Sequence, residues 1–343
     1  MVYPEQSPEP GFAPSSFLQA WETTMTQPTY IGIDVAKAEL VVATPTTIIG
    51  NFPNDHDGHR ALIKRLGTLD VQGIVLESTG CYSRAPAVTL SEAGFSVAIV
   101  QPGRVRHFAL SGGVRAKTDA IDARVIAQFG ASHKPRVWTT PPAHTTRLRA
   151  LVDRRDQIIE ARKREENHLE ACADAGIARE LRRVITRLKK DEAAYGKKIA
   201  AQLAEHDELR QMSDALQAEA GVGMHTAAVL LSFMPELGRL NRQQVAALIG
   251  FAPYNRDSGD QQGKRAIYGG RRRLRRALSM AAISAARSSE WIKPIYQRLR
   301  ERGKPAKVAL VACGRKLAIR LNSIAGAALA QAAAITPSAV HPA

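Results

Sequence analysis

The stretch of residues 147–216 constrains the fold more than any other part of this chain of 343 residues. It contains no proline and only two glycines, and its charges are dense and of both signs. This composition favours long helices over strands or loops. Apolar residues form a broken seam along it, at Leu148, Leu151, Ile158, Leu169, Ile177, Leu181, Val184, Leu188, Tyr195, Ile199 and Leu203. We predict a coiled coil or helical hairpin that turns near residues 174–176, with its charges on a solvated face.

The residues before this stretch show short apolar runs separated by turn residues. Strands are expected at 30–37, 39–43, 47–52, 73–77 and 95–100, and helices at 55–66, 82–93, 105–110 and 119–132. The first three strands should form an antiparallel hairpin or meander. The later alternation of strand and helix predicts an α/β layer fold that ends near His133.

These patterns divide the chain into several predicted parts. The opening residues are rich in Pro, Ser and Glu, which is typical of disorder, and Met25 could be the true start. The parts are a disordered extension at 1–27, an α/β domain at 28–134, a Pro/Thr-rich linker at 135–146, a helical coiled-coil region at 147–210, a mostly α-helical basic domain at 211–325 and a tail at 326–343.

The excess positive charge is concentrated in one block. Residues 261–320 hold 17 Lys and Arg against two acids, whereas the rest of the chain holds 31 basic and 30 acidic residues. Such a block indicates a nucleic-acid partner. An anionic membrane surface is the competing partner, but the glycines and proline at 269–270 and 303–305 interrupt any single amphipathic face.

Other features point to a cytoplasmic protein without a membrane partner. Cys81, Cys172 and Cys313 are isolated, so we expect reduced thiols, no disulfide and no zinc site. No apolar run reaches membrane-spanning length, and no basic residue precedes Lys37, which argues against a signal peptide.

Four acids form the candidate catalytic site. Asp119 and Asp122 lie one turn apart on a helix, Asp34 lies in a strand, and Glu77 ends another strand. Strand ends and helix starts meet at one edge of an open α/β sheet, where four carboxylates would repel one another unless cations lay between them. Two Mg²⁺ ions would make the clamp used in phosphoryl chemistry. The alternative for each acid is a structural role. Asp119 would cap its helix and Asp122 would lie in the first turn, where the dipole favours acids, while Asp34 would end a strand and Glu77 would be a turn acid.

Two further motifs could contact the phosphates of a nucleic acid. Arg115 and Lys117 flank the acidic pair and could contact a polyanion. Gly221 and Gly223 precede an apolar helix, as in a helix-hairpin-helix whose backbone contacts phosphate, although a plain helix–helix turn would have the same pattern.

Four sequence blocks resemble one family. Gly-Ile-Asp-Val-Ala-Lys at 32–37, Leu-Glu-Ser-Thr-Gly at 76–80 and Lys-Thr-Asp-Ala-Ile-Asp-Ala at 117–123 resemble the three blocks of the DEDD transposases of the insertion sequence 110 family. Gly-Phe-Ala-Pro-Tyr-Asn-Arg-Asp-Ser-Gly at 250–259, with the basic run after it, resembles the second region of that family. The resemblance covers about residues 28–325 and keeps the blocks in order.

The resemblance implies a fold, a site and partners. The first domain would be RNase H-like, of the RuvC type, with Asp34, Glu77, Asp119 and Asp122 as metal ligands for two Mg²⁺ ions, or Mn²⁺ in their place. Ser258 would be the nucleophile, although Asp257 departs from the usual small polar residue beside it. Family members act on donor and target DNA, use an element-encoded structured RNA, and form dimers that assemble into tetramers.

In this interpretation the serine and the basic run act together. Ser258 would attack a phosphodiester and conserve the bond as a phosphoserine ester. Taken alone, a serine before glycine is typical of an ordinary turn. Phosphate contacts are predicted for the basic residues around and after the serine, namely Arg256, Lys264, Arg265, Arg271, Arg272, Arg273, Arg275 and Arg276.

We therefore predict a transposase that performs site-specific strand cleavage and exchange. The nearest alternative is a hydrolytic, metal-dependent junction-resolving nuclease without a covalent intermediate. A kinase or ATPase of the actin-like fold is a second, because Gly-Ile-Asp-Val resembles its first phosphate loop, but the chain lacks the later Gly-rich adenosine loop. A non-catalytic nucleic-acid-binding protein is the third, and the four acids argue against it.

Overall fold

The computed structural model describes residues 29–80, 82–114, 118–254 and 265–335. The chain separates into two compact units, Met1–Thr140 and Pro141–Ala343, and each is described by itself. The predicted division at 28–134, 147–210 and 211–325 is finer than these two units. The predicted extension at 1–27, with Met25, lies outside the described residues.

The N-terminal unit is built on a five-stranded sheet of order β3-β2-β1-β4-β5. β1, β2 and β3 form the predicted antiparallel meander, and β4 and β5 run parallel to β1. The strands are β1 (Thr29–Val35), β2 (Glu39–Ala43), β3 (Ile48–Pro53), β4 (Val71–Glu77) and β5 (Val97–Val100). The expected mixed α/β fold is confirmed for this unit.

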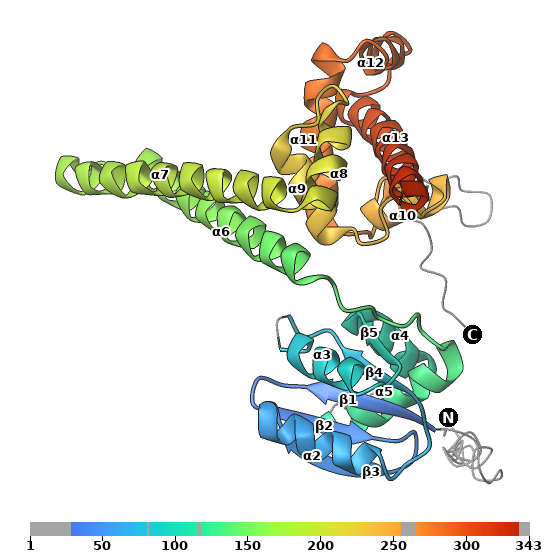
Figure 1. Ribbon diagram of the computed structural model, residues 1–343. Helices are drawn as coiled ribbons and strands as arrows, with labels where there is room; N and C mark the ends of the chain where they lie inside the picture. Colours follow the sequence, from blue (N-terminus) through green and yellow to red (C-terminus); the bar gives the residue numbers. More distant parts are fainter. Residues whose placement is uncertain (1–28, 81, 115–117, 255–264, 336–343) are drawn as a thin grey trace, which may run out of the picture. The chain divides into compact units, whose positions relative to one another are not determined.

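Helices cover both faces of this sheet (Figure 1). α2 (His56–Leu66) and α3 (Arg84–Glu92) pack on the face that carries Ile31 and Ile33. α4 (Pro102–Ser111) and α5 (Asp119–His133) pack on the other face, which carries Val75 and Ala98. Because β1, β4 and β5 are buried on both sides, their sequences are nearly continuous apolar runs instead of alternating ones.

The segment after α5 stays attached to this unit. The backbone N–H of Trp138 donates a hydrogen bond to the carbonyl oxygen of Val97 at 2.7 Å. The indole packs against the apolar cluster under α2 and α3. Part of the predicted linker is therefore a structural strap of the N-terminal unit.

Two long antiparallel helices open the second unit, as predicted. α6 (Ala143–Ala171) and α7 (Ala175–Glu205) lie side by side as a hairpin (Figure 1). Asp174 caps α7, because its Oδ1 accepts a hydrogen bond from the N–H of Ile177 at 2.8 Å. The predicted seam is only partly buried: Ile177 is 55% exposed and Val184 is 40% exposed, and Ile185 is the buried neighbour on α7.

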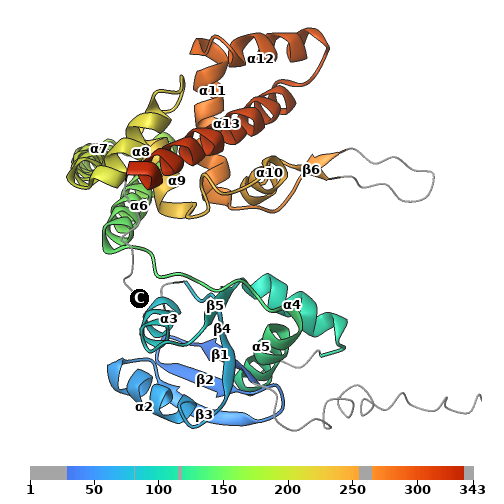
Figure 2. The ribbon, with the colours of Figure 1, turned by 45° about the vertical axis from the view of Figure 1, so that its right-hand side comes forward.

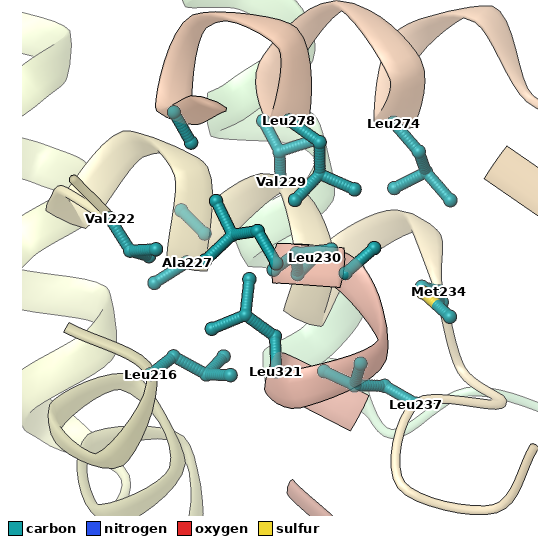
Figure 3. Packing of buried hydrophobic residues seen from close by; sticks show 14 of the residues in the cluster. Leu216, Val222, Ala227, Val229, Leu230, Met234, Leu237, Leu274, Leu278 and Leu321 are labelled. Atoms are coloured by element: carbon teal, nitrogen blue, oxygen red, sulfur yellow. The ribbon is translucent and has the colours of Figure 1, made fainter. Parts of the chain in front are cut away.

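The remaining elements are helices that pack around a second apolar core (Figure 3) and two short exposed strands. They are α8 (Asp207–Gln217), α9 (Met224–Phe233), α10 (Arg242–Ile249), β6 (Pro253–Tyr254), β7 (Ala266–Ile267), α11 (Arg272–Ser288), α12 (Ile292–Glu301) and α13 (Ala306–Ile335). Leu230 of α9, Leu278 of α11 and Leu321 of α13 meet there. α13 continues through the first residues of the predicted tail at 326–343. In the described part of the chain, no helix has the length and apolarity needed to cross a bilayer.

Candidate active site and nucleic-acid interface

Asp34 and Glu77 lie on the same face of the N-terminal sheet. Ile33 of β1 pairs with Leu76 of β4 in parallel register. Asp34 directly follows Ile33, and Glu77 directly follows Leu76. Ile33 and Leu76 belong to the cluster under α2 and α3. Since side chains alternate between faces along a strand, both acids lie on the opposite face, which α4 and α5 cover, at the C-terminal end of the strands.

α5 runs antiparallel to β1 on this face, and the contacts of two glycines show it. A Cβ atom added at Gly32 would lie 2.1 Å from the carbonyl oxygen of Ala123, and one at Gly130 would lie 2.9 Å from Cδ1 of Tyr30. Late residues of α5 therefore lie beside the start of β1. The first turn of α5 must then lie towards the end of β1, where Asp34 is.

That first turn carries the acidic pair. Thr118 is the N-cap of α5, and its Oγ1 accepts a hydrogen bond from the N–H of Ile121 at 3.3 Å. The alternative in which Asp119 caps the helix is therefore wrong. Asp119 is exposed and Asp122 is half-buried, and both occupy the first turn, where the helix dipole favours acids.

The backbone thus brings the four predicted acids to one face and one end of the sheet. Their donor chemistry suits a hard cation such as Mg²⁺, because carboxylate oxygens are its usual protein ligands. Within the described residues, however, no three His, Cys, Asp or Glu side chains are close enough together to hold a metal ion. The Mg²⁺ site therefore stays a prediction.

The segment that contains Ser258 has a well-defined base. β6 and β7 pair antiparallel, Pro253 with Ile267 and Tyr254 with Ala266, and Figure 2 shows β6 following α10. A Cβ atom added at Gly270 would lie 2.3 Å from the backbone nitrogen of Gly250, so the two backbones touch. Ser258, Arg256 and Lys264 lie outside the described residues, as do Arg115 and Lys117; Arg265 is described and exposed.

The arginine run at the start of α11 consists of Arg271, Arg272, Arg273, Arg275 and Arg276. Most of these arginines form ion pairs or hydrogen bonds with other groups of the protein. Arg271 makes a two-pronged ion pair with Glu236, at 2.8 and 2.7 Å, and also donates to the carbonyl oxygen of Phe233. Its guanidinium therefore ties the base of the Ser258 segment to the loop after α9. Such a bidentate pair holds both partners in one geometry.

Two further arginines of the run converge on one buried carboxylate. Asp156 of α6 is 3% exposed. Its Oδ2 forms an ion pair with Nε of Arg273 at 3.1 Å and accepts a hydrogen bond from Nη2 of Arg276 at 2.8 Å. His225 lies beside it with Nε2 at 3.6 Å from Oδ1, and burial lowers the pKa of His225 below its usual range. The cluster joins α6, α9 and α11, and the sequence showed no sign of it beyond the opposite charges.

The other two arginines of the run differ from these. Arg275 donates to the carbonyl oxygen of Gly269. Arg272 is exposed and forms no ion pair with another described residue. Only Arg272 therefore keeps the exposed, unengaged character that the sequence suggested for the whole run.

Packing accounts for one of the two predicted phosphate-binding glycines. Gly221 has a φ of +90°, and an added Cβ atom would lie 2.6 Å from the backbone nitrogen of Ala285 on α11. Gly223 is the N-cap of α9, and a Cβ atom there would meet nothing within 4 Å. Close packing of helices explains Gly221, and a helix-hairpin-helix stays a prediction for this turn.

The basic helical unit indicates a nucleic-acid partner, and acids at the C-terminal end of the sheet suit chemistry on phosphate. Comparison with known families agrees with an enzyme that acts on nucleic acid. A transposase family model matches residues 31–177, and a model of the IS116/IS110/IS902 transposase family matches residues 213–297. The chain belongs to the IS110 family of transposases and is a DNA transposase or recombinase.

Two relatives match most of the chain, and a third matches about a third of it. The chain is 29% identical over 314 residues to the pilin gene-inverting protein of Moraxella bovis, covering 84% of this chain and 93% of the relative. The pilin gene-inverting protein of Moraxella lacunata matches with the same identity and coverage. An uncharacterized 43.6 kDa protein of insertion element IS110 from Streptomyces coelicolor is 32% identical over 111 residues, covering 32% of this chain and 27% of that protein.

Proposed function

We propose that the transposase cleaves and exchanges DNA strands through a metal-dependent site formed by Asp34, Glu77, Asp119 and Asp122. The observation that carries this proposal is the position of all four acids on one face and at one end of the sheet. The same arrangement supports an RNase H-like fold of the RuvC type for this unit. Two Mg²⁺ ions bound there, or Mn²⁺ in their place, would stabilise charge on the attacking and leaving oxygens.

In this proposal Ser258 is the attacking group. Its Oγ forms a bond to phosphorus and loses its proton, while the bond from phosphorus to the strand oxygen breaks and that oxygen leaves as a hydroxyl after taking up a proton. The phosphoserine ester conserves the bond, so a second DNA end can displace the serine without an external source of energy. Support comes from the family and from the paired strands β6 and β7, which the Ser258 segment joins.

A relative favours strand exchange over simple hydrolysis. The Moraxella proteins are named for inverting a pilin gene, and inversion requires that cut strands be rejoined. A hydrolytic junction-resolving nuclease would leave the cut ends free. We therefore place strand exchange ahead of hydrolysis for this chain.

The partners follow from the family and the charge. Donor and target DNA are the substrates of a transposase, and the basic block of residues 261–320 could hold RNA as well as DNA. We extend to this chain the family's structured guide RNA and its dimers that assemble into tetramers. Sequencing the nucleic acid that co-purifies with the protein would test the guide.

The serine distinguishes recombinase from nuclease. Wild-type protein with Mg²⁺ and substrate DNA should form a protein–DNA adduct that survives denaturation. Ser258→Ala should lose the adduct and the cleavage together, because no positioned oxygen remains to attack phosphorus. Ser258→Cys should keep a trace at most, since a thiolate is a good nucleophile but a poor match to hard Mg²⁺.

The control is an exposed serine of the same unit. Ser284 lies on α11 outside the Ser258 segment, so Ser284→Ala should form the adduct normally. Nicking by Ser258→Ala at the wild-type rate would reject the covalent mechanism and favour the hydrolytic nuclease.

A further inference from the structure

A large groove lies in the helical unit, and none of the arginines at 271–276 lines it. It is bounded by α10, the β6–β7 pair, α11 and the N-terminal half of α13, and its volume is about 1540 Å³. Pockets for small molecules measure roughly 300–1,000 Å³. The groove is therefore large enough for a section of a polymer.

Among the described residues that line it, all the charged ones are basic. They are Arg242, Arg265, Lys304, Lys307, Arg315 and Lys316. Among the described residues, none of the six forms an ion pair, whereas Arg271, Arg273 and Arg276 all do. Five of the six, all except Arg242, belong to the block of residues 261–320, so the groove gathers cations of this block that no acid of the described residues neutralises.

Apolar side chains lie between these cations. Val308 is 52% exposed and Ile267 is 37% exposed, and both line the groove. On α13, Val308, Val311 and Arg315 follow one another at spacings of three and four, so they share one helix face. A positively charged groove that follows the backbone is common to proteins that bind single strands. The aliphatic side chains between the cations add an apolar surface for unpaired bases and sugars, which a duplex backbone would not need.

We propose that this groove binds a single-stranded segment of nucleic acid, with phosphates on the six cations and bases or sugars on Ile267 and Val308. The proposal rests on the transposase function for its class of partner, but not on the four acids or on Ser258. The strand could belong to DNA opened during exchange or to RNA. Both offer the same phosphates and unpaired bases, so the experiment compares them.

The test measures binding of the full-length chain to a single-stranded DNA, a single-stranded RNA and a duplex DNA of equal length at several salt concentrations. The groove variant Lys307→Gln/Arg315→Gln/Lys316→Gln removes three lining cations. The control variant Arg287→Gln/Lys293→Gln/Arg298→Gln removes three cations of the same basic block that do not line the groove. Melting temperatures establish that both variants fold.

We expect the groove variant to bind single strands at least about tenfold more weakly, with a salt slope reduced by about 0.7 for each phosphate that the protein no longer neutralises. The control should change little. Val308→Ser should weaken single-strand binding without changing the slope, because it removes an apolar surface and no charge. A preference for DNA or for RNA would identify the source of the strand.

Equal binding and equal slope in the groove and control variants would overturn the proposal, as would a loss confined to duplex DNA. Strand cleavage separates this outcome from a failure of the proposed function. If the groove variant binds normally and substitutions of the four acids abolish cleavage, only the groove assignment fails. If those acid variants still cleave, the proposed metal site fails whatever the groove binds.

Discussion

Asp34 and Glu77 share a face because of simple strand geometry. Ile33 and Leu76 are paired in parallel register, and they directly precede Asp34 and Glu77. Because side chains alternate between the two faces of a strand, burial of the two aliphatic side chains on one face places both carboxylates on the face that α5 covers. Carboxylates that are close together repel one another, and a bound cation reverses this effect. The acids should therefore matter for chemistry and little for retention of DNA.

Substitution of each acid should separate these two effects. Asp34→Asn, Glu77→Gln, Asp119→Asn and Asp122→Asn should each reduce strand cleavage by at least about a hundred-fold and leave DNA binding largely unchanged. Cleavage and gel-shift assays in Mg²⁺ provide the measurements. Asp70→Asn is the matched control, since Asp70 is an exposed acid of the same unit. Recombination by three of the four variants would contradict the metal-clamp interpretation.

Asp156 carries a different kind of prediction. It is 3% exposed and pairs with Arg273 and Arg276, so Asp156→Ala would leave two guanidinium groups without their buried partner. Both guanidinium groups are partly exposed and each keeps a second acid, Asp153 for Arg273 and Glu160 for Arg276. The loss should therefore be that of a hydrogen bond to a charged group, about 1.5–3 kcal/mol. Denaturant unfolding should show a loss of this size for Asp156→Ala.

The control is Glu160→Ala. Glu160 also pairs with Arg276, at 3.3 Å, but both side chains are more than half exposed, so its loss should cost no more than about 1 kcal/mol. Equal effects of the two substitutions would show that burial does not govern this cluster. A large loss for Asp156→Ala would also mean that neutralising the whole arginine run destabilises the unit as well as its nucleic-acid contacts.

At the scale of elements, the base of the Ser258 segment depends on a contact between two backbones. Gly270 has a φ of +72°, and its position against Gly250 leaves no room for a side chain. Gly269 has a φ of +67°, but a Cβ atom there would meet nothing within 4 Å. The two adjacent glycines therefore separate the cost of backbone conformation from the cost of a steric clash.

Gly270→Ala should destabilise the helical unit more than Gly269→Ala. The left-handed conformation alone costs about 1–2 kcal/mol for a residue with a Cβ atom, and the clash at Gly270 should add about 1–3 kcal/mol. Denaturant midpoints give the stabilities, and adduct formation reports whether the Ser258 segment still works. Equal losses at both positions would show that the contact between Gly250 and Gly270 yields without cost.

At the scale of the whole molecule, the division into two compact units predicts that the N-terminal unit can be expressed by itself. The N-terminal unit extends to Thr140, and Trp138 belongs to it through a hydrogen bond to Val97 and through its packed indole. A fragment of residues 25–140 should therefore fold and unfold cooperatively. A fragment of residues 25–134, which ends at the boundary suggested by the sequence, lacks this strap.

Thermal unfolding should distinguish the two fragments. Loss of about 1–2 kcal/mol of indole packing should lower the melting temperature by roughly 4–8 °C for each kcal/mol in a domain of this size. Trp138→Ala in the longer fragment should reproduce the melting temperature of the shorter one. Identical melting temperatures for all three would show that the strap contributes nothing.

The distribution of charge is also a property of the whole molecule. The sequence places 17 basic residues in one block, but the fold pairs several of them with acids that come from distant parts of the chain, such as Asp156 and Glu236. The charge available to a polyanion is therefore smaller than the composition suggests, and part of it lies at the groove beside α13.

The sequence by itself determined the features that depend on local chemistry. The period of its apolar residues predicted the meander, the strands β4 and β5 and the hairpin of α6 and α7, because strand and helix repeats follow from backbone geometry. The four acids could be singled out by their place at strand ends and in a first helical turn. The family blocks also showed which class of enzyme the chain belongs to.

Only the tertiary structure decided which long-range contacts those residues make. The pairing of Arg273 and Arg276 with Asp156, the approach of Gly32 to α5 and the strap at Trp138 join residues far apart in sequence. The partially exposed seam of α7 is a further case, because helical spacing marks a face but not what covers it. Local patterns report the conformation of a segment, whereas contacts depend on how segments pack, and that packing carries the information that periodicity lacks.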